Sequence, residues 1–151
     1  MSTVSPVPPG PLPADAWWRA LGLPSWIGAS MLDLARMDLA AHPQLQLPAR
    51  LGNSVEKRRR EFLGGRICAR EALRLAGHPA AAYPAMGEDR LPVWPSGWLG
   101  SISHSGGLAM ALAAPASACR VLGVDVQERR ALGNLDGVQS LVAAEGELDA
   151  M

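Results

Sequence analysis

The clearest element in this sequence is a predicted helix over residues 55–76, and the shorter segments around it are expected to pack against it. The stretch contains no proline, and side chains for one buried face recur at helical spacing: Phe62, Arg66, Ala69 and Leu73. Gly77 supplies a stop signal and Pro79 follows it. Asn53 is the predicted N-cap, because Glu56 stands three residues later, at the spacing of a capping box.

Two adjacent glycines lie in the middle of this predicted helix. Gly64 and Gly65 each lower the helix propensity by ~1 kcal/mol relative to alanine. Such a loss makes sense where another element packs closely against that face of the helix. We therefore expect a close contact at these two glycines.

Six arginines decorate the same stretch: Arg58, Arg59, Arg60, Arg66, Arg70 and Arg74. One interpretation is a solvated face, partly paired with Glu61 and Glu71. Arg58 and Arg66 are two turns apart, so they point the same way within roughly 80°. Two guanidinium groups on one side of a helix could bind separated phosphates.

The glycine-rich stretch 100–107 joins two predicted strands, 98–103 and 108–114, as a hairpin. Its small residues let the backbone and short hydroxyls approach a ligand, with the His104 imidazole beside them. These groups, with the upstream arginines and an aspartate one strand later, would suit a phosphorylated ligand with a metal. The alternative is a tight turn and an ordinary strand-end aspartate.

That aspartate is Asp125, in the predicted strand 121–127, where it faces away from Val124 and Val126. Residues 133–151 form at most a short predicted helix. The edge of the strand 121–127 would then be unpaired and exposed.

The other segments are less informative. Residues 1–13 are rich in proline and are expected to be disordered or an extended arm. Residues 31–42 fit either a short helix or a strand and turn. Residues 87–95 form a predicted loop from which Arg90 projects. Three tryptophans are expected to cover the core, with a partner surface as the alternative: Trp17, Trp18 and Trp26.

Composition excludes several classes of function. The formal net charge is zero, so no global field attracts nucleic acid or a membrane surface. No run approaches the ~20 apolar residues of a membrane span, and the first residues lack the basic and apolar regions of a signal peptide. Cys68 and Cys119 are too few for a disulfide scaffold, so a reduced, cytoplasmic protein is expected.

Common catalytic motifs do not fit. Ser101 and Ser103 lack the surroundings of a nucleophile elbow, and a serine next to its own histidine has no triad geometry. The spacing of the histidines matches no zinc pattern. The sequence also lacks a Walker loop and a Gly-x-Gly-x-x-Gly motif.

Four motifs in order resemble the 4′-phosphopantetheinyl transferases of the two-repeat type, a family that includes enterobactin synthase component D and actinobacterial enzymes of siderophore, peptide and polyketide synthesis. The resemblance covers residues 50–147. The motifs are Lys57-Arg58 with Glu61-Phe62 and Arg66-x-Cys68-Ala69-Arg70, then Arg90-x-Pro92-x-Trp94-Pro95, then Gly100-Ser101-Ile102-Ser103-His104, and last Gly123-Val124-Asp125.

The resemblance implies coenzyme A as substrate and an acyl or peptidyl carrier protein as partner. Arg58 and Arg66 would bind phosphates of coenzyme A. Arg90 and Ser103 would meet its 3′-phosphate and adenosine end. His104 would contact the pyrophosphate. The implied reaction is attack of a carrier-protein serine on the pantetheine-side phosphate, with release of 3′,5′-ADP.

The resemblance also implies a Mg²⁺ site. Asp125 would be the catalytic residue that holds the ion against the pyrophosphate, with Gln127 as the second ligand. The family usually has Asp-x-Glu here, so Gln127 is a departure that removes one charge. Mg²⁺ takes few carboxylates and completes its shell with water and phosphate oxygens.

The implied fold is α/β (α+β), the first of two similar halves plus the start of the second. Residues 14–120 would be the N-terminal half, after an arm over 1–13, and residues 121–151 a truncated start of the C-terminal half. The family's third motif, Trp/Phe-x-x-Lys-Glu, does not occur before Met151. We therefore expect poor transfer by the chain as given. The alternatives are a non-catalytic coenzyme A-binding remnant and a protein-interaction module.

Overall fold

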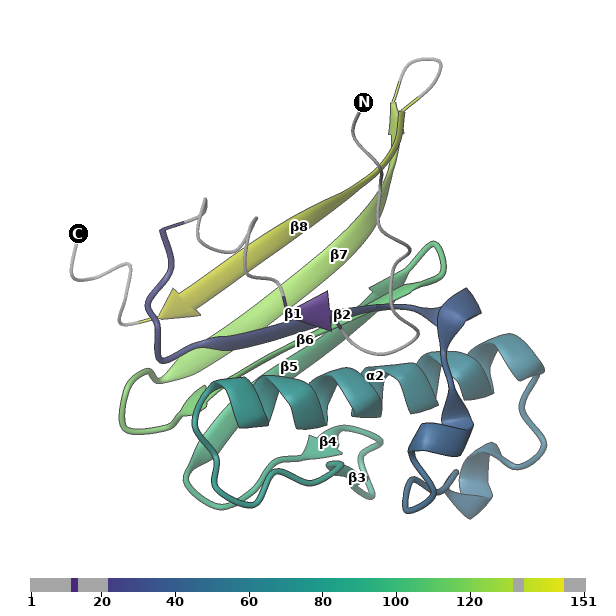
Figure 1. Ribbon diagram of the computed structural model, residues 1–151, viewed down its shortest axis with the longest axis horizontal. Coiled ribbons are helices and arrows are strands. Elements are labelled where there is room, and N and C mark those ends of the chain that lie inside the picture. The colour runs from purple at the N-terminus through teal and green to yellow at the C-terminus, as the bar shows by residue number, and fades with distance from the viewer. Residues whose placement is uncertain (1–11, 14–21, 132–134, 146–151) are drawn as a thin grey trace.

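A long helix packed against an antiparallel sheet organises the molecule (Figure 1). The computed structural model describes the backbone of residues 12–13, 22–131 and 135–145, and the side chains of residues 22–127. The sheet has the strand order β1-β2-β6-β5. Its strands are β1 (Leu12–Pro13), β2 (Gly28–Asp33), β5 (Trp98–Ser105) and β6 (Leu108–Pro115). The prediction of mixed helix and sheet is thus confirmed at the level of fold class.

The β5–β6 hairpin is confirmed, with register from Trp98↔Pro115 to Ser105↔Leu108. A two-residue turn, Gly106-Gly107, connects the strands. Both glycines have positive φ, at 58° and 84°. This conformation matches the twist of the flanking strands and favours glycine.

Helix α2 (Glu56–Leu75) confirms the predicted helix but not its cap. The N-cap residue is Val55, in an extended conformation, and no side chain caps the first turn. Asn53 as N-cap is therefore wrong. The cause is the preceding segment: the 3-10 helix η3 (Ala49–Leu51) continues into a turn in which the Ser54 N–H donates to the Leu51 carbonyl at 3.0 Å.

Residues 31–42 adopt the strand-and-turn alternative. Strand β2 ends at Asp33 and is followed by two short 3-10 helices, η1 (Leu34–Arg36) and η2 (Leu39–Ala41). Asp33 and Asp38 each accept a hydrogen bond from a backbone N–H two residues later, at 3.0 and 3.1 Å. These aspartates favour turns over a continuous helix because they satisfy backbone donors locally.

The core occupies both faces of the sheet. Toward α2, β6 presents small side chains that let the helix approach closely: Ala109, Ala111 and Ala113. The opposite face of β6 presents Met110, Leu112 and Ala114 to a second apolar cluster. The close contact expected at the helix glycines is present, because a Cβ on Gly64 would lie 2.2 Å from Cδ2 of Leu34.

The strands β7 (Val121–Ala131) and β8 (Leu135–Glu145) cover that second face as an antiparallel hairpin. The predicted strand 121–127 is confirmed and extended. The short helix predicted over 133–151 is wrong where the structure describes it, and so is the unpaired edge, since β8 pairs with β7 along its whole length. Pairing with a neighbouring strand outweighs the local pattern here. Residues 132–134 and 146–151 lie outside the described residues.

Several sequence predictions fall wholly or partly where the structure gives no description: Trp17, Trp18, and the arm over residues 1–13, of which only Leu12–Pro13 are described, as strand β1. Trp26 packs against the second apolar cluster, as expected of core cover. Cys68 and Cys119 are buried free thiols. Among the described residues, no helix combines the length and apolar character needed to cross a bilayer.

One short pairing closes the predicted loop 87–95, between β3 (Ala85–Met86), which precedes it, and β4 (Pro92–Val93), which lies within it. Trp94 packs against β5, where a Cβ on Gly100 would lie 2.2 Å from its indole ring. The loop is thereby held beside α2 and the sheet.

Candidate functional site

A pocket beside the first half of α2 brings together four residues that the sequence singles out. Its volume is about 330 Å³. Arg58 and Arg66 come from α2, Arg90 from the loop between β3 and β4, and His104 from β5. The remaining lining residues are Leu51, Glu61, Phe62, Met86, Pro92 and Ile102.

Arg66 is the most deeply placed of these cations, with only 6% of its surface exposed. Its Nε donates to the Pro84 carbonyl at 2.9 Å, and its guanidinium lies 4.3 Å from the centre of the Phe62 ring. Burial lowers the pKa of Arg66 to about 10, so it stays charged at neutral pH. Its Nη2 is buried without a hydrogen-bond partner. An unsatisfied charged donor is costly, so the site suits an anion.

His104 is oriented by Glu61, a residue of the first family motif whose pairing with His104 the sequence did not predict. Its Nδ1 lies 2.8 Å from Oε2 of Glu61, and the Glu61 side chain is largely covered. Donation from Nδ1 to this carboxylate leaves Nε2 for a ligand. Glu61 had been interpreted as a partner of surface arginines. The spacing of residues within the helix does not reveal its pairing with β5, because the two residues are far apart in sequence.

Arg90 occupies the loop between β3 and β4 with a positive φ of 68°. Its N–H donates to the Gly87 carbonyl at 2.9 Å. Arg50 supports the same loop, since its Nη1 donates to the Glu88 carbonyl at 2.9 Å. Arg50 was not predicted, and nothing in its local sequence indicates this contact.

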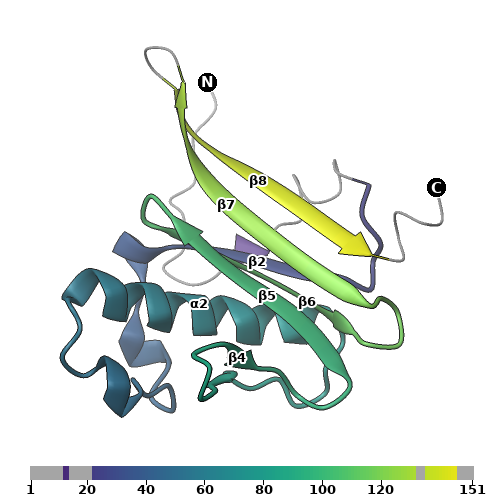
Figure 2. The same ribbon diagram turned by 180° about the vertical axis from the view of Figure 1, so that it is seen from behind.

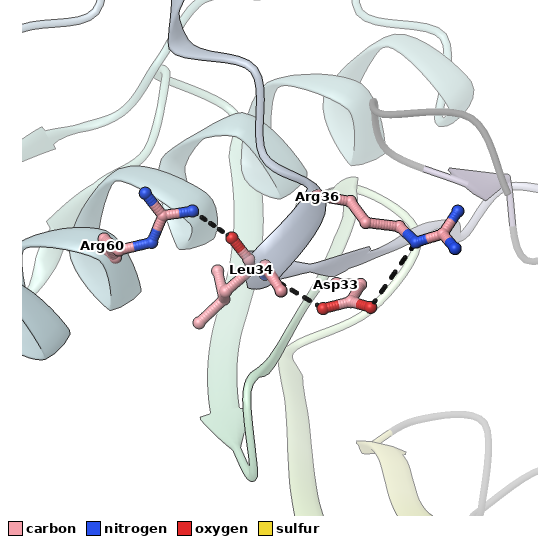
Figure 3. A network of polar contacts seen from close by, with 5 residues as sticks. Asp33, Leu34, Arg36 and Arg60 are labelled. Carbon is pink, nitrogen blue, oxygen red and sulfur yellow. Dashed lines mark hydrogen bonds and ion pairs between the residues drawn. The ribbon is translucent and has the colours of Figure 1, made fainter.

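The other arginines of α2 have structural partners. Arg60 donates to the Leu34 carbonyl and so ties the helix to η1, beside the Asp33–Arg36 ion pair (Figure 3). Arg70 donates to the Tyr83 hydroxyl at 2.7 Å. The remaining two have partners close in sequence: Arg59 donates to the Gly52 carbonyl and Arg74 pairs with Glu71. Arg58 and Arg66 differ from these four arginines in lining the pocket that also contains Arg90 and His104.

Ser103 is not among the residues that line this pocket. Its hydroxyl accepts a hydrogen bond from the Val126 N–H at 3.0 Å, and the Ser101 hydroxyl accepts one from the Val124 N–H at 3.2 Å. Figure 2 shows β7 running beside β5, as these contacts require.

Asp125 is exposed on β7, and Gln127 Nε2 donates to its Oδ2 at 2.6 Å. Val124 and Val126 pack in the apolar cluster, so Asp125 faces away from it. One carboxylate and one amide carbonyl form an all-oxygen donor pair, which fits Mg²⁺ when phosphate and water supply the other ligands. In the part of the chain that the structure describes, no group of three acidic, histidine or cysteine side chains could hold a metal.

Comparison with known proteins indicates the family. The family model of the 4′-phosphopantetheinyl transferase N-terminal domain matches residues 47–114, which include Arg58, Arg66, Arg90 and His104. Three relatives illustrate the similarity. The 4′-phosphopantetheinyl transferase Npt of Nocardia iowensis is 39% identical over 118 residues, covering 77% of this chain and 52% of the relative.

The 4′-phosphopantetheinyl transferase PptT of Mycobacterium tuberculosis is 35% identical over 120 residues, covering 76% of this chain and 52% of the relative. Enterobactin synthase component D of Escherichia coli O157:H7 is 44% identical over 80 residues, covering 53% of this chain and 36% of the relative. The chain therefore spans about half, or less, of the length of these curated relatives. The matched region, the four motifs in their order and the pocket that joins three of them support the assignment of this chain to the 4′-phosphopantetheinyl transferase superfamily.

Proposed function

We propose that this chain provides the coenzyme A-binding half of a 4′-phosphopantetheinyl transferase that acts on an acyl or peptidyl carrier protein. The observation that carries the proposal is the convergence of Arg58, Arg66, Arg90 and His104 on one pocket. Residues from three separate elements meet there, and all can be cationic. Such a set is suited to the phosphates of coenzyme A, because guanidinium groups form strong charge-assisted hydrogen bonds with phosphate oxygens.

Each group has a distinct part in this proposal. Buried Arg66, with its unsatisfied Nη2, and Arg58 bind phosphates. Arg90 binds at the 3′-phosphate and adenosine end. His104, held by Glu61, offers Nε2 to the pyrophosphate. Residues 14–120 correspond in this proposal to the family's first half, and residues from 121 onward to its second.

Asp125 and Gln127 are the proposed ligands of Mg²⁺, which would neutralise charge on the pyrophosphate. Gln127 brings an oxygen but no charge, so the free protein is expected to bind Mg²⁺ weakly. Coenzyme A should strengthen that binding by adding phosphate oxygens.

The proposed reaction is a transfer of the phosphopantetheine group. A bond forms between the carrier serine oxygen and the pantetheine-side phosphorus, and the bond from that phosphorus to the bridging pyrophosphate oxygen breaks. The electron pair leaves with 3′,5′-ADP, and the serine proton passes to a base. This chemistry depends mainly on positioning and charge stabilisation, which the pocket residues can supply. The base expected from the resemblance belongs to the Lys-Glu motif, which the 151 residues do not contain.

Calorimetric titration with coenzyme A tests the binding proposal. Replacement of Arg58 or Arg66 by alanine should weaken binding roughly ten- to a hundredfold, because a charge-assisted contact contributes ~1.5–3 kcal/mol. Arg74→Ala is the matched control, since Arg74 lies on the same helix and pairs with Glu71. Coenzyme A should also bind more tightly than dephospho-coenzyme A. Equal loss in Arg58→Ala and Arg74→Ala would contradict the assignment of the pocket.

A carrier-protein modification assay, read by the mass added to the carrier serine, tests the activity. We expect robust transfer from the chain joined to a relative's C-terminal half, and little from residues 1–151 alone. Loss of a general base typically costs 10²–10⁴-fold. Robust transfer by residues 1–151 would show that a base lies within them. A joined chain that binds coenzyme A but modifies no carrier protein would favour a non-catalytic coenzyme A-binding protein.

A further inference from the structure

We propose that Ser101 and Ser103 are positioning residues for Asp125. Their hydroxyls hold the backbone on either side of that aspartate, at Val124 and Val126. The inference rests on the proposed function in one respect, that Asp125 is taken as a metal ligand. The two hydrogen bonds themselves are features of the described structure.

The geometry is that of a two-point clamp. The Val124 N–H donates to the Ser101 Oγ at 3.2 Å, and the Val126 N–H donates to the Ser103 Oγ at 3.0 Å. Both bonds join residues 23 positions apart, so β5 and β7 run in the same direction here. Asp125 lies between the two anchored amides.

The two serine hydrogen bonds lie between an edge of β5 and an edge of β7 that are not joined by a ladder of backbone hydrogen bonds. Strand β5 is the last strand of its sheet and β7 pairs with β8, so the two strands belong to different sheets. Alternate residues of a strand direct their N–H groups to the same edge, which is why Val124 and Val126 can both reach β5. The serine hydroxyls satisfy these donors in place of a neighbouring strand's carbonyls.

The packing of side chains on one face of β7 also restricts this segment. Val126 is 2% exposed and belongs to the apolar cluster, and Val124 packs against it. With two amides and two side chains anchored, rotation of the segment is hindered. The backbone of Asp125 is therefore held with its Cα–Cβ bond directed away from the cluster, which lowers the entropic cost of binding an ion.

This arrangement gives the two faces of β5 different tasks. Successive residues of a strand point to opposite faces. His104 lines the pocket, whereas Ser103 faces β7. The hydroxyl that the family resemblance assigns to the adenosine end of coenzyme A is thus already an acceptor for Val126. One face of β5 would thus carry His104, which binds phosphate. The other face would carry Ser101 and Ser103, which position the metal-binding Asp125.

The clamp and a direct contact with coenzyme A predict different results for Ser103→Ala. A positioning role leaves coenzyme A affinity without metal close to that of the unchanged protein and reduces the gain in affinity that Mg²⁺ produces. A direct contact lowers the affinity without metal. The variants are Ser101→Ala, Ser103→Ala and their combination. Ser103→Thr should restore the gain because it keeps a hydroxyl, and Ser117→Ala, in an exposed turn, is the control.

Amide hydrogen exchange followed by NMR supplies a readout independent of metal and activity. Exchange at Val124 and Val126 should rise roughly three- to tenfold in the alanine variants, as expected for the loss of one hydrogen bond. Exchange at Ala111 in β6 should stay unchanged, which separates loss of the clamp from general destabilisation. If the combined variant does not fold, the single variants carry the same test.

If hydrogen exchange at Val124 and Val126 is unchanged in the alanine variants, the clamp is overturned, regardless of the measured affinity or activity. Faster exchange with an unchanged Mg²⁺-dependent gain would overturn its role in positioning Asp125. Failure of the unchanged protein to bind coenzyme A would overturn the proposed function and the positioning role with it, while the exchange rates still decide whether the clamp exists.

Discussion

Arg90 illustrates how a single residue can serve a site at a cost to the fold. Among the described residues it is the non-glycine residue with positive φ, and its side chain lines the pocket. This backbone conformation costs an L-residue roughly 1–2 kcal/mol. Strain of this kind persists where the surrounding structure imposes it, and here Gly87 and Leu91 close the turn around Arg90.

Arg90→Gly should therefore separate stability from binding. Glycine removes the strain but increases the freedom of the unfolded chain by roughly 0.5–1 kcal/mol, so the net stability should be unchanged or rise by about 1 kcal/mol. Coenzyme A affinity should fall roughly ten- to a hundredfold. Thermal unfolding and calorimetric titration measure the two effects. Arg90→Ala, which keeps the strain, is the control for loss of the side chain alone.

At the scale of elements, the contact of α2 with β2 and η1 determines where the site lies. A Cβ on Gly28 would lie 1.9 Å from the Ala72 carbonyl oxygen, which is helix backbone. A Cβ on Gly64 would lie 2.2 Å from Cδ2 of Leu34, which is the end of a side chain. The helix can approach so closely only because both positions lack a side chain. This approach holds Arg58 and Arg66 next to the sheet strand that carries His104.

Gly28→Ala should destabilise the protein more than Gly64→Ala. A backbone carbonyl cannot yield without moving the helix, whereas the Leu34 side chain can change rotamer. We expect a loss of about 1–3 kcal/mol for Gly64→Ala, partly offset by ~1 kcal/mol of helix propensity, and a larger loss for Gly28→Ala. Urea denaturation measures both. A stabilising Gly28→Ala would mean that the helix does not lie as close as described.

At the scale of the whole molecule, a polar chain links segments that are distant in sequence. The Tyr83 hydroxyl lies 2.6 Å from Nδ1 of His42 and accepts a hydrogen bond from Arg70. Because a hydroxyl has one proton, Tyr83 donates to His42 when Nδ1 is unprotonated. Burial and the nearby Arg70 charge lower the pKa of His42 from its ordinary 6.5, while Asp38 opposes the shift.

The sign of this shift gives a pH dependence. The folded state prefers neutral His42, so its contribution to stability is complete above the ordinary pKa of 6.5 and is lost as the pH falls through the lowered value. The melting temperature of the unchanged protein should therefore fall more between pH 7.5 and pH 5.5 than that of His42→Gln. The comparison removes the shared titration of carboxylates. Equal falls in the two proteins would exclude His42 as the source.

The local sequence pattern predicted well those features that depend on a single element. The helix period predicts a helix over 55–76, which the structure shows over 56–75, and it predicts the common direction of Arg58 and Arg66. Residue type predicts the β5–β6 hairpin, because two glycines supply the positive φ that its turn needs. The need for a close neighbour at Gly64 also follows from sequence, since glycine costs helix propensity.

Features that depend on two distant segments were decided by tertiary structure. Arg90 and His104 join the α2 arginines only when the loop and β5 pack beside the helix. Residues 135–145 have apolar spacing that fits a helix, yet they form β8 because the β7 edge offers eleven consecutive pairs. The hydrogen bond between Ser103 and Val126 could not be predicted from the sequence, because hydrogen bonds between separate strands leave no periodic pattern in it. Local periodicity indicates which face of its own helix or strand a side chain occupies. The residue that this side chain contacts depends on which distant segment packs against that face.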